Sequence, residues 1–325
     1  MLAAYYEMNG SARDVLRVGE VETPAPAPGE VRVKIAASAV NPSDVKSRLG
    51  VTRKIAYPRV IPHSDGAGII DAVGEGVSQS RIGERVWLWN GQWKRAFGTA
   101  AQFITLPSAQ AVRLPDGVSF AEGACLGIPA MTAIHAIDMA NPGADTTLLI
   151  SGGAGSVGQY AIQFAKMRGA RVLTTISSPE KAKIARDLGA DYTLDYKREN
   201  VGERVMEITG QRGVDAIIEM DLTANAKLIP STLCPKGSVI VYGTGGEAML
   251  PAHFCLINSI AIRFFLVYEL DAVARERAVN GITRALEAGV LINNTEPPFP
   301  LREIAAAHEA VEQGRGTGNV IVTTE

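Results

Sequence analysis

Three glycines, Gly153, Gly155 and Gly158, have the spacing of a turn that binds the pyrophosphate of a dinucleotide. The apolar segment Thr147–Ile150 before the three glycines predicts a strand. After the glycines, apolar residues recur at the spacing of a helix. A second strand is predicted over Arg171–Ile176. The glycine spacing alone is a weak signal, but a strand, turn, helix and strand within about thirty residues make it informative.

Each glycine has a physical role in such a turn. We expect Gly153 to permit the tight turn, Gly155 to let the backbone approach the pyrophosphate, and Gly158 to let the helix pack against the strand. The free backbone N–H groups at Ser156 and Val157, where the helix starts, then face the anion. A glycine-rich turn that binds nothing is the less favoured alternative, so we expect a bound dinucleotide.

The residues after the second strand indicate which dinucleotide binds. An NAD site usually has Asp or Glu there, which accepts hydrogen bonds from the ribose hydroxyls. In this chain Ser177 and Ser178 stand in that place, and Lys181 follows in the first turn of the next helix. The hydroxyls can donate to a 2′-phosphate and the lysine can pair with it, whereas Glu180 is expected to point outward because Pro179 opens the helix. We therefore predict NADPH, with a solvated surface role for Lys181 as the alternative.

The composition limits the other partners. The chain has 325 residues, 46% of them hydrophobic and 20% charged, with a net charge of −2, so nothing in its charge favours a nucleic acid or an anionic membrane. Its apolar runs are too short to span a bilayer, and its first residues lack the pattern of a signal peptide. The widely spaced Cys125, Cys234 and Cys255 predict reduced thiols, a cytoplasmic setting and no cysteine-based metal site.

The order of predicted elements indicates two domains. Residues 1–124 contain short strands, such as the alternating Val31–Ile35, and form a β-rich domain. Strand and helix alternate over residues 125–266, which is typical of a doubly wound, parallel Rossmann sheet. Residues 267–325 begin with a helix predicted at Ala272–Ala288 and do not continue this alternation. We assign them to the first domain, which leaves a cleft between two lobes.

A set of short motifs occurs in one order along almost the whole chain: Pro28-Gly-Glu-Val-x-Val, Ala39-Val-Asn-Pro-Ser-Asp, His63-Ser-Asp-Gly-Ala-Gly, Gly127-Ile-Pro-Ala-Met-Thr-Ala, the turn at Gly153 and Leu188-Gly-Ala-Asp. In these motifs the chain resembles the medium-chain dehydrogenase/reductase superfamily, and within it the zinc-independent quinone oxidoreductase branch related to zeta-crystallin. The resemblance implies an α/β protein with a GroES-like β-barrel domain and a Rossmann domain, and a nicotinamide bound in the cleft between them.

The resemblance also implies that no metal binds. Zinc-dependent members have a cysteine near the position of Asn41, a histidine where Ser64 stands, and a further cysteine where Ile128 stands. Neither Ser64 nor Ile128 has a side chain that suits zinc. His63 lies one position away, where a structural role is expected, and Ser80–Val112 lacks the four cysteines of the zinc enzymes.

By the same resemblance, Asn41 lies near the nicotinamide, where its amide can donate to a developing oxyanion, and Thr132 approaches the nicotinamide ring. Each has a structural alternative, because Asn before Pro42 favours a turn start and Thr132 can bond the backbone of its own helix. Asp44 is interpreted as an outward-facing turn residue rather than an acid near the substrate. The loop Leu49–Arg59 is a candidate lid over the site, and Tyr57 is its one candidate proton donor, with a proton from solvent as the alternative.

Four further residues are predicted cofactor contacts. Tyr196 matches a position that packs near the adenosine phosphate, and Gly243 and Thr244 follow the fifth strand, where they should line the cofactor groove. Asn319 stands where the family commonly has a lysine that contacts the cofactor.

The chemistry expected of such a site is hydride transfer from NADPH to a small molecule that delocalises the incoming charge, such as a quinone or a conjugated carbonyl compound. An enone or 2-enoyl thioester reductase shares every motif and is the alternative; Arg53, Lys54 and Arg59 would supply a basic groove for a coenzyme A thioester. A binding-only protein is the third possibility, and turnover distinguishes it. Trp87, Trp89 and Trp93 are candidates for an aromatic wall of the acceptor site, although one of them can be core.

The segment Ile260–Tyr268 is apolar and, by its order in the chain, lies at the edge of the sheet. An apolar edge strand left open invites aggregation. By resemblance we expect two copies to pair there as a homodimer.

Overall fold

The computed structural model describes residues 1–52, 54–314 and 316–324. The chain divides into two compact units, one made of Met1–Ile128 with Thr283–Glu325 and the other of Pro129–Ile282. Among the described residues, no helix is both long and apolar enough to cross a membrane.

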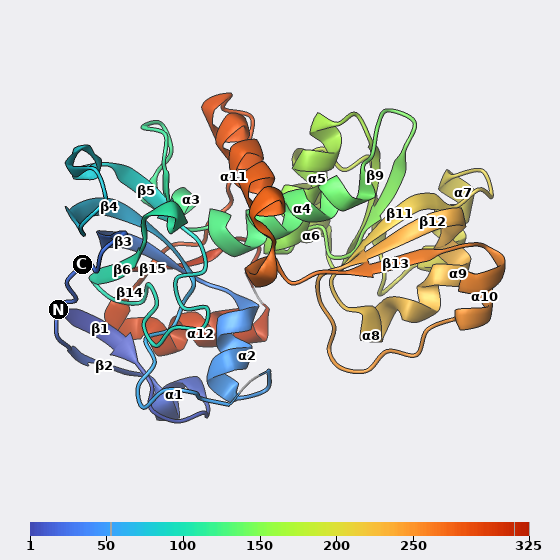
Figure 1. Ribbon diagram of the computed structural model, residues 1–325. Helices are drawn as coiled ribbons and strands as arrows, with labels where there is room; N and C mark the ends of the chain where they lie inside the picture. Colours follow the sequence, from blue (N-terminus) through green and yellow to red (C-terminus); the bar gives the residue numbers. More distant parts are fainter. Residues whose placement is uncertain (53, 315, 325) are drawn as a thin grey trace. The chain divides into compact units, whose positions relative to one another are not determined.

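The first unit is built around β3 (Glu30–Val40), which pairs with three other strands (Figure 1). The sheet order is β14-β15-β3-β4-β5-β7, with β6 also paired to β3, and β1 and β2 form a separate two-stranded sheet. The remaining strands are β1 (Leu2–Tyr5), β2 (Arg17–Glu20), β4 (Asp65–Val73), β5 (Arg85–Leu88), β6 (Phe103–Pro107), β7 (Ala111–Arg113), β14 (Phe299–Pro300) and β15 (Val320–Thr323). The helices are α1 (Ala12–Val15), α2 (Pro42–Leu49), α3 (Phe120–Gly123) and α12 (Ile304–Gln313).

The alternating pattern of β3 produces its two faces. Val31, Val33 and Ile35 are buried in one apolar cluster, while Arg32 points away and pairs with Asp71 at 2.9 Å. The antiparallel pairing of β15 with β3 shows that the end of the chain joins this β-rich unit, as the sequence predicts.

The second unit holds a six-stranded parallel sheet in the order β10-β9-β8-β11-β12-β13. Its strands are β8 (Thr147–Ile150), β9 (Arg171–Ile176), β10 (Tyr192–Asp195), β11 (Val214–Glu219), β12 (Leu233–Val241) and β13 (Ala261–Phe264). Its helices are α4 (Met131–Ala140), α5 (Ser156–Met167), α6 (Pro179–Asp187), α7 (Val201–Ile208), α8 (Leu222–Asn225), α9 (Ile229–Thr232), α10 (Ala252–Ile257) and α11 (Ala272–Glu287). Helices α4 and α5 cover one face, while α7, α8 and α9 enclose a core against the other (Figure 1).

The order of this sheet reverses between β8 and β11. Strand β8 leads outward through β9 to β10, whereas β11 leads in the opposite direction to β13. Such a reversal leaves a crevice at the carboxyl ends of the two central strands, which is where open α/β sheets bind ligands.

The division between the units differs from the sequence prediction at both boundaries. The second unit begins at Pro129 rather than at residue 125, and it keeps most of α11, whereas the sequence predicts that everything after residue 266 belongs to the first domain. The reason is close packing: a Cβ on Gly281 of α11 would lie 2.3 Å from Cδ1 of Ile134 on α4. A glycine at this point lets the two helices approach each other closely.

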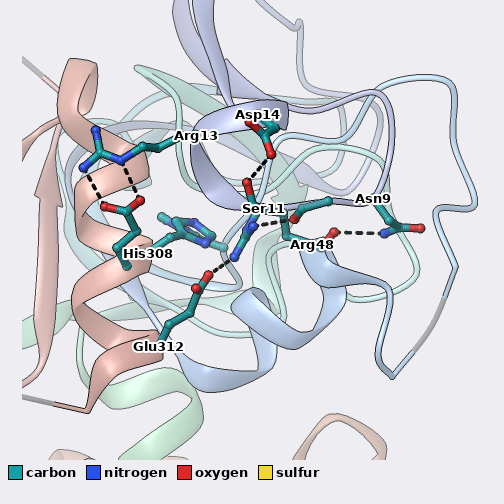
Figure 2. A network of polar contacts seen from close by, with 10 residues as sticks. Asn9, Ser11, Arg13, Asp14, Arg48, His308 and Glu312 are labelled. Carbon is teal, nitrogen blue, oxygen red and sulfur yellow. Dashed lines mark hydrogen bonds and ion pairs between the residues drawn. The ribbon is translucent and has the colours of Figure 1, made fainter.

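A buried polar network ties α12 to α2 and to the residues before β4. Figure 2 shows its outer part, in which the fully buried Arg48 pairs with Glu312 and donates to the carbonyl of Gly10 at 2.5 Å, with His308 beside them. Further inside, Nε2 of His308 lies 2.9 Å from Nε2 of His63.

The donors in the inner part of the network follow one consistent order. The Thr99 hydroxyl donates to the Asp65 carbonyl at 2.6 Å, so the Ser38 hydroxyl must donate to Thr99 across their 2.8 Å contact. The Ser38 oxygen then accepts from Nδ1–H of His63, at 2.8 Å, and Nε2 of His63 accepts from His308. Both histidines are therefore neutral, which agrees with their pKa values: burial lowers that of His63 to about 3 and, together with His63 and Arg48, lowers that of His308 well below its usual range.

We expect this pair to make folding stability depend on pH. Below about pH 6.5 the unfolded histidines take up protons that the folded pair excludes, so the free energy of unfolding falls as the pH is lowered, by up to about 1.4 kcal/mol per pH unit for each histidine. Urea unfolding of the wild type and the His308→Gln variant between pH 6.5 and 5 measures this slope, and the variant should lose part of it. His253→Gln, at an exposed histidine, is the control; equal slopes in all three proteins would contradict the account.

Candidate functional site

The second unit contains a cavity of about 640 Å³ at the carboxyl ends of its central strands. Leu149 of β8 and Ile217 of β11 form part of its lining, which places it at the reversal of strand order. Its walls also include Ser151, Gly152, Ala154, Gly155, Ser177, Lys181, Tyr196, Glu199, Glu219, Asp221, Asn225 and Lys227. The glycine turn and the residues after β9, which the sequence selected separately, thus line one cavity.

The glycine turn has a different division of roles from the one predicted. The left-handed backbone falls on Gly152, at φ +69°, and not on Gly153. Gly153 instead packs against β9, since a Cβ there would lie 2.1 Å from Oγ1 of Thr174. Gly158 does provide close packing, because its Cβ would come within 2.3 Å of the Gly152 carbonyl oxygen.

The start of α5 presents backbone donors as a dinucleotide site requires. Gly155 is the N-cap, and a Cβ there would meet only the Gly152 oxygen, at 3.3 Å. Ser156 and Val157 are the first residues of α5, and their N–H groups precede the first intrahelical bond, from Gln159 N to Gly155 O. Such groups have no partner within a helix and suit an anion.

The end of β9 carries hydroxyl and lysine groups. Ser177 and Lys181 both line the cavity, as the prediction of a 2′-phosphate contact requires. Ser178 is the N-cap of α6, where its oxygen accepts from Lys181 N at 3.3 Å, so its first role is to start the helix. Glu180 is exposed, and the Ser178 hydroxyl lowers the pKa of its carboxyl.

The other predicted cofactor contacts lie in three places. Tyr196 lines the cavity and is 54% exposed, with its N–H donating to the carbonyl of Ile176 at the end of β9. Gly243 and Thr244 follow β12 just outside the cavity lining, where Gly243 packs against the Met220 carbonyl. Asn319 belongs to the first unit, and its side chain donates to the carbonyl of Asn294 at 3.0 Å.

Glu219 also lines this cavity and is not among the predicted site residues. It ends β11, is 3% exposed, and accepts hydrogen bonds from the Ser151 hydroxyl, the Asp221 N–H and the Asn225 amide at 2.6–2.9 Å. These bonds hold the cavity lining in place where β8 and β11 end. The signal was available, since an acid at the carboxyl end of a predicted central strand falls where such sheets bind ligands.

Asn41 in the first unit is both a helix cap and part of a buried polar cluster. It is the N-cap of α2, followed by Pro42 in the first turn, so the predicted structural role holds. Its Nδ2 also donates to Oδ2 of Asp65 at 2.8 Å. Asp44 is not the outward turn residue that we expected, because it is only 5% exposed and its carboxylate accepts from Asn41 N at 2.8 Å.

Tyr57 lines a second, smaller cavity of about 200 Å³ in the first unit. Ser47 from α2, Tyr6, Lys54, Val60 and Lys94 also line it. Arg59, one of the residues named for the basic groove of a thioester reductase, pairs with Glu7 at 2.7 Å, and Arg53 lies outside the described residues.

Thr132 is buried near the start of α4 in the second unit. The turn before it, Leu126–Ala130, is a π-helical turn that contains Pro129. The three tryptophans do not form one exposed wall, because Trp87 is fully buried among core residues of β5 while Trp89 and Trp93 are partly exposed.

The positions that the resemblance compares with zinc ligands carry Asn41, Ser64 and Ile128. His63 is held between Ser38 and His308, and its neighbour Ser64 is buried. Within the described part of the chain, no three His, Cys, Asp or Glu side chains gather in a way that suits a metal ion. Burial raises the pKa of the Cys125 and Cys234 thiols, which keeps both in the protonated form.

Comparison with known proteins gives this geometry its context. Residues 27–116 match the alcohol dehydrogenase GroES-like domain and residues 156–283 match the zinc-binding dehydrogenase family. Quinone oxidoreductase from Homo sapiens is 30% identical over 330 residues, which cover 95% of this chain and 94% of that protein. A 2-haloacrylate reductase from Burkholderia is 28% identical over 318 residues, 93% of each chain. A mycobacterial protein solved in complex with NADPH superimposes with a TM-score of 0.89 at 25% identity, over 99% of this chain and 100% of that one.

A GroES-like domain joined to a Rossmann domain defines the medium-chain dehydrogenase/reductase superfamily, to which this protein belongs. Within it, the chain belongs to the quinone oxidoreductase branch, as its motifs indicated. It is thus an oxidoreductase of a family that uses nicotinamide cofactors.

Two glycine variants test whether Gly158 serves packing of the turn and Gly155 serves the approach of a ligand. Gly158→Ala should lower the free energy of unfolding by about 1–3 kcal/mol, because its Cβ would press on backbone that has little room to move. Gly155→Ala should lower the free energy of unfolding less than Gly158→Ala does, because its Cβ would meet only the Gly152 oxygen, at 3.3 Å. It should weaken binding of a nicotinamide cofactor at least about tenfold, because a Cβ is added where the turn is expected to approach a phosphate. Thermal unfolding and fluorescence titration measure the two effects, and identical behaviour of both variants would contradict these roles.

Proposed function

We propose that this protein reduces quinones or related conjugated carbonyl compounds with NADPH and without zinc. The observation that carries the proposal is that the glycine turn, Ser177 and Lys181 line one cavity at the reversal of strand order. In it, the N–H groups that begin α5 hold the pyrophosphate, and Ser177, Ser178 and Lys181 hold the 2′-phosphate. The bound cofactor supplies the hydride.

The side chains of this protein position and polarise the acceptor. Asn41 uses one N–H on Asp65, and its second N–H donates to the acceptor oxygen as negative charge develops there. Thr132 orients the nicotinamide end of the cofactor, and Tyr57 donates a proton or a hydrogen bond from the lid. Because quinones and enones delocalise the incoming charge, these donors suffice without a metal.

An enone or 2-enoyl thioester (alkene) reductase is the alternative. The Burkholderia relative named 2-haloacrylate reductase supports it. Lys54 and Lys94 support it as well, because they line the small cavity beside Tyr57 and suit an acceptor that carries a negative charge.

We further propose a homodimer that forms through the edge of the Rossmann sheet. Strand β13 is that edge, and Phe264 and Leu266 are 60% and 48% exposed there. Pairing of two β13 strands would satisfy their free backbone groups and cover these side chains. Sedimentation at micromolar concentration should give twice the chain mass of 34.4 kDa, and a monomer would contradict this proposal.

The cofactor contact is tested with two lysines on one helix. Lys181→Ala should weaken NADPH binding about tenfold or more and leave NADH binding unchanged, because only NADPH carries the phosphate that the lysine would pair with. Lys183→Ala is the matched control, since Lys183 lies on the same helix and pairs with Asp187 at 2.5 Å. Equal losses of affinity for NADPH and NADH, or equal losses in both variants, would contradict a contact between Lys181 and the 2′-phosphate.

The reaction is tested with NADPH and a panel of acceptors followed at 340 nm: 1,4-benzoquinone, 9,10-phenanthrenequinone, 2-cyclohexenone and crotonyl-CoA. We expect turnover with the quinones that survives dialysis against a chelator. Turnover with the enone or the thioester alone would select the alternative, and no turnover with any acceptor would contradict an enzymatic role in this chemistry.

A further inference from the structure

Asp65 is a buried carboxyl group that the proposed reaction does not use directly. It begins β4 and is fully buried. In the pairing of β3 with β4 it lies opposite Ala39, which precedes Asn41 by two residues. One of its oxygens, Oδ2, accepts two hydrogen bonds, from Asn41 Nδ2 at 2.8 Å and from Ile128 N at 2.9 Å. Its other oxygen, Oδ1, is buried without a hydrogen-bond partner among the described residues.

The surroundings hold this carboxyl group in place. Its main-chain carbonyl accepts from Thr99, so the start of the strand is fixed. Gly127 leaves just enough room beside it, because a Cβ there would lie 2.2 Å from Asp65 Oδ1 and 2.6 Å from the Leu88 carbonyl oxygen. The Ile128 N–H that donates to Asp65 belongs to the π-helical turn Leu126–Ala130, so this irregular turn supplies one of the two donors.

We infer that Asp65 is a positioning residue for Asn41, which fixes the plane of its amide so that the second N–H points toward the acceptor. A carboxyl oxygen that already accepts two N–H groups cannot face the Asn41 carbonyl oxygen, so the amide is held in one of its two flipped states. Burial and the nearby Asp44 raise the pKa of Asp65 well above its usual range.

This inference rests on the proposed function, since it needs Asn41 to contact the acceptor. Asp65→Ala should lower kcat with 9,10-phenanthrenequinone about tenfold to a hundredfold, because a small misplacement of a donor is costly. The KM for NADPH should stay within about twofold, because the cofactor phosphates bind in the other unit. Asp65→Asn should recover most of the loss, since its side-chain oxygen can accept the same two N–H groups. Asp71→Ala, on the same strand, is the control for general damage to the sheet.

Two results distinguish a role of Asp65 in positioning Asn41 from a role in stability alone. In the Asn41→Ala background, Asp65→Ala should cause no further loss of kcat, whereas independent losses that multiply would overturn the inference. If Asp65→Ala does not fold, Gly127→Ala displaces the same carboxyl group and serves in the same comparison. An Asp65→Asn variant as impaired as Asp65→Ala would also overturn it.

A measurement on the protein without cofactor tests the contact independently of turnover. In protein labelled with ¹⁵N-asparagine, the Asn41 amide signal is identified by its loss in Asn41→Ala. It should be shifted and slow to exchange in the wild type and in Asp71→Ala, and should move to free-amide values in Asp65→Ala. An unchanged signal in Asp65→Ala would overturn the inference, whereas a wild type that reduces no acceptor would overturn only the proposed function.

Discussion

The contact between helix α5 and the turn that precedes it is the constraint on which the cavity of the second unit depends. There the backbone of Gly158 comes so close to the carbonyl of Gly152 that no side chain fits between them. This approach brings the first N–H groups of α5 to the end of β8, where the strand order reverses. The same turn packs through Gly153 on Thr174 of β9, which sets the position of Ser177 and Lys181 relative to it. These two packing contacts therefore set both sides of the cavity that we propose for the cofactor.

The other unit depends on the short segment before and at the start of β4. His63 and Asp65 lie two residues apart and serve different neighbours: His63 bonds α12 through His308, and Asp65 bonds Asn41 at the start of α2. Thr99 joins the two through Ser38 and the Asp65 carbonyl. The packing of the C-terminal helix and the orientation of the candidate catalytic amide are thus linked by one set of hydrogen bonds. The side chains of this segment thus bond to other parts of the unit, His63 to Ser38 and His308 and Asp65 to Asn41.

Local patterns predicted much of this architecture. The strands of the Rossmann sheet, its edge strand, the turn at Gly153–Gly158 and the return of the chain to the β-rich unit follow from periodicity and turn residues, which are properties of neighbouring positions. What the sequence did not reveal depends on contacts between distant segments. Gly281 lets α11 pack on α4, and Glu219 accepts a hydrogen bond from Ser151 of a distant segment besides those from Asp221 and Asn225 nearby. The exception is Asp44, whose inward turn is local, since its carboxylate caps its own helix. The left-handed residue of the turn is Gly152, whereas Gly153, which we expected to permit the tight turn, packs against Thr174.

The central claim is that the cavity of the Rossmann unit selects NADPH for a reductase reaction. The most direct measurement is the ratio of kcat/KM for NADPH and NADH on the unmodified protein, with 9,10-phenanthrenequinone as the common acceptor. Since a charge-assisted contact to the 2′-phosphate is worth about 1.5–3 kcal/mol, we predict a ratio of at least about ten in favour of NADPH. A ratio below one would contradict the assignment of Ser177 and Lys181 and the account built on it.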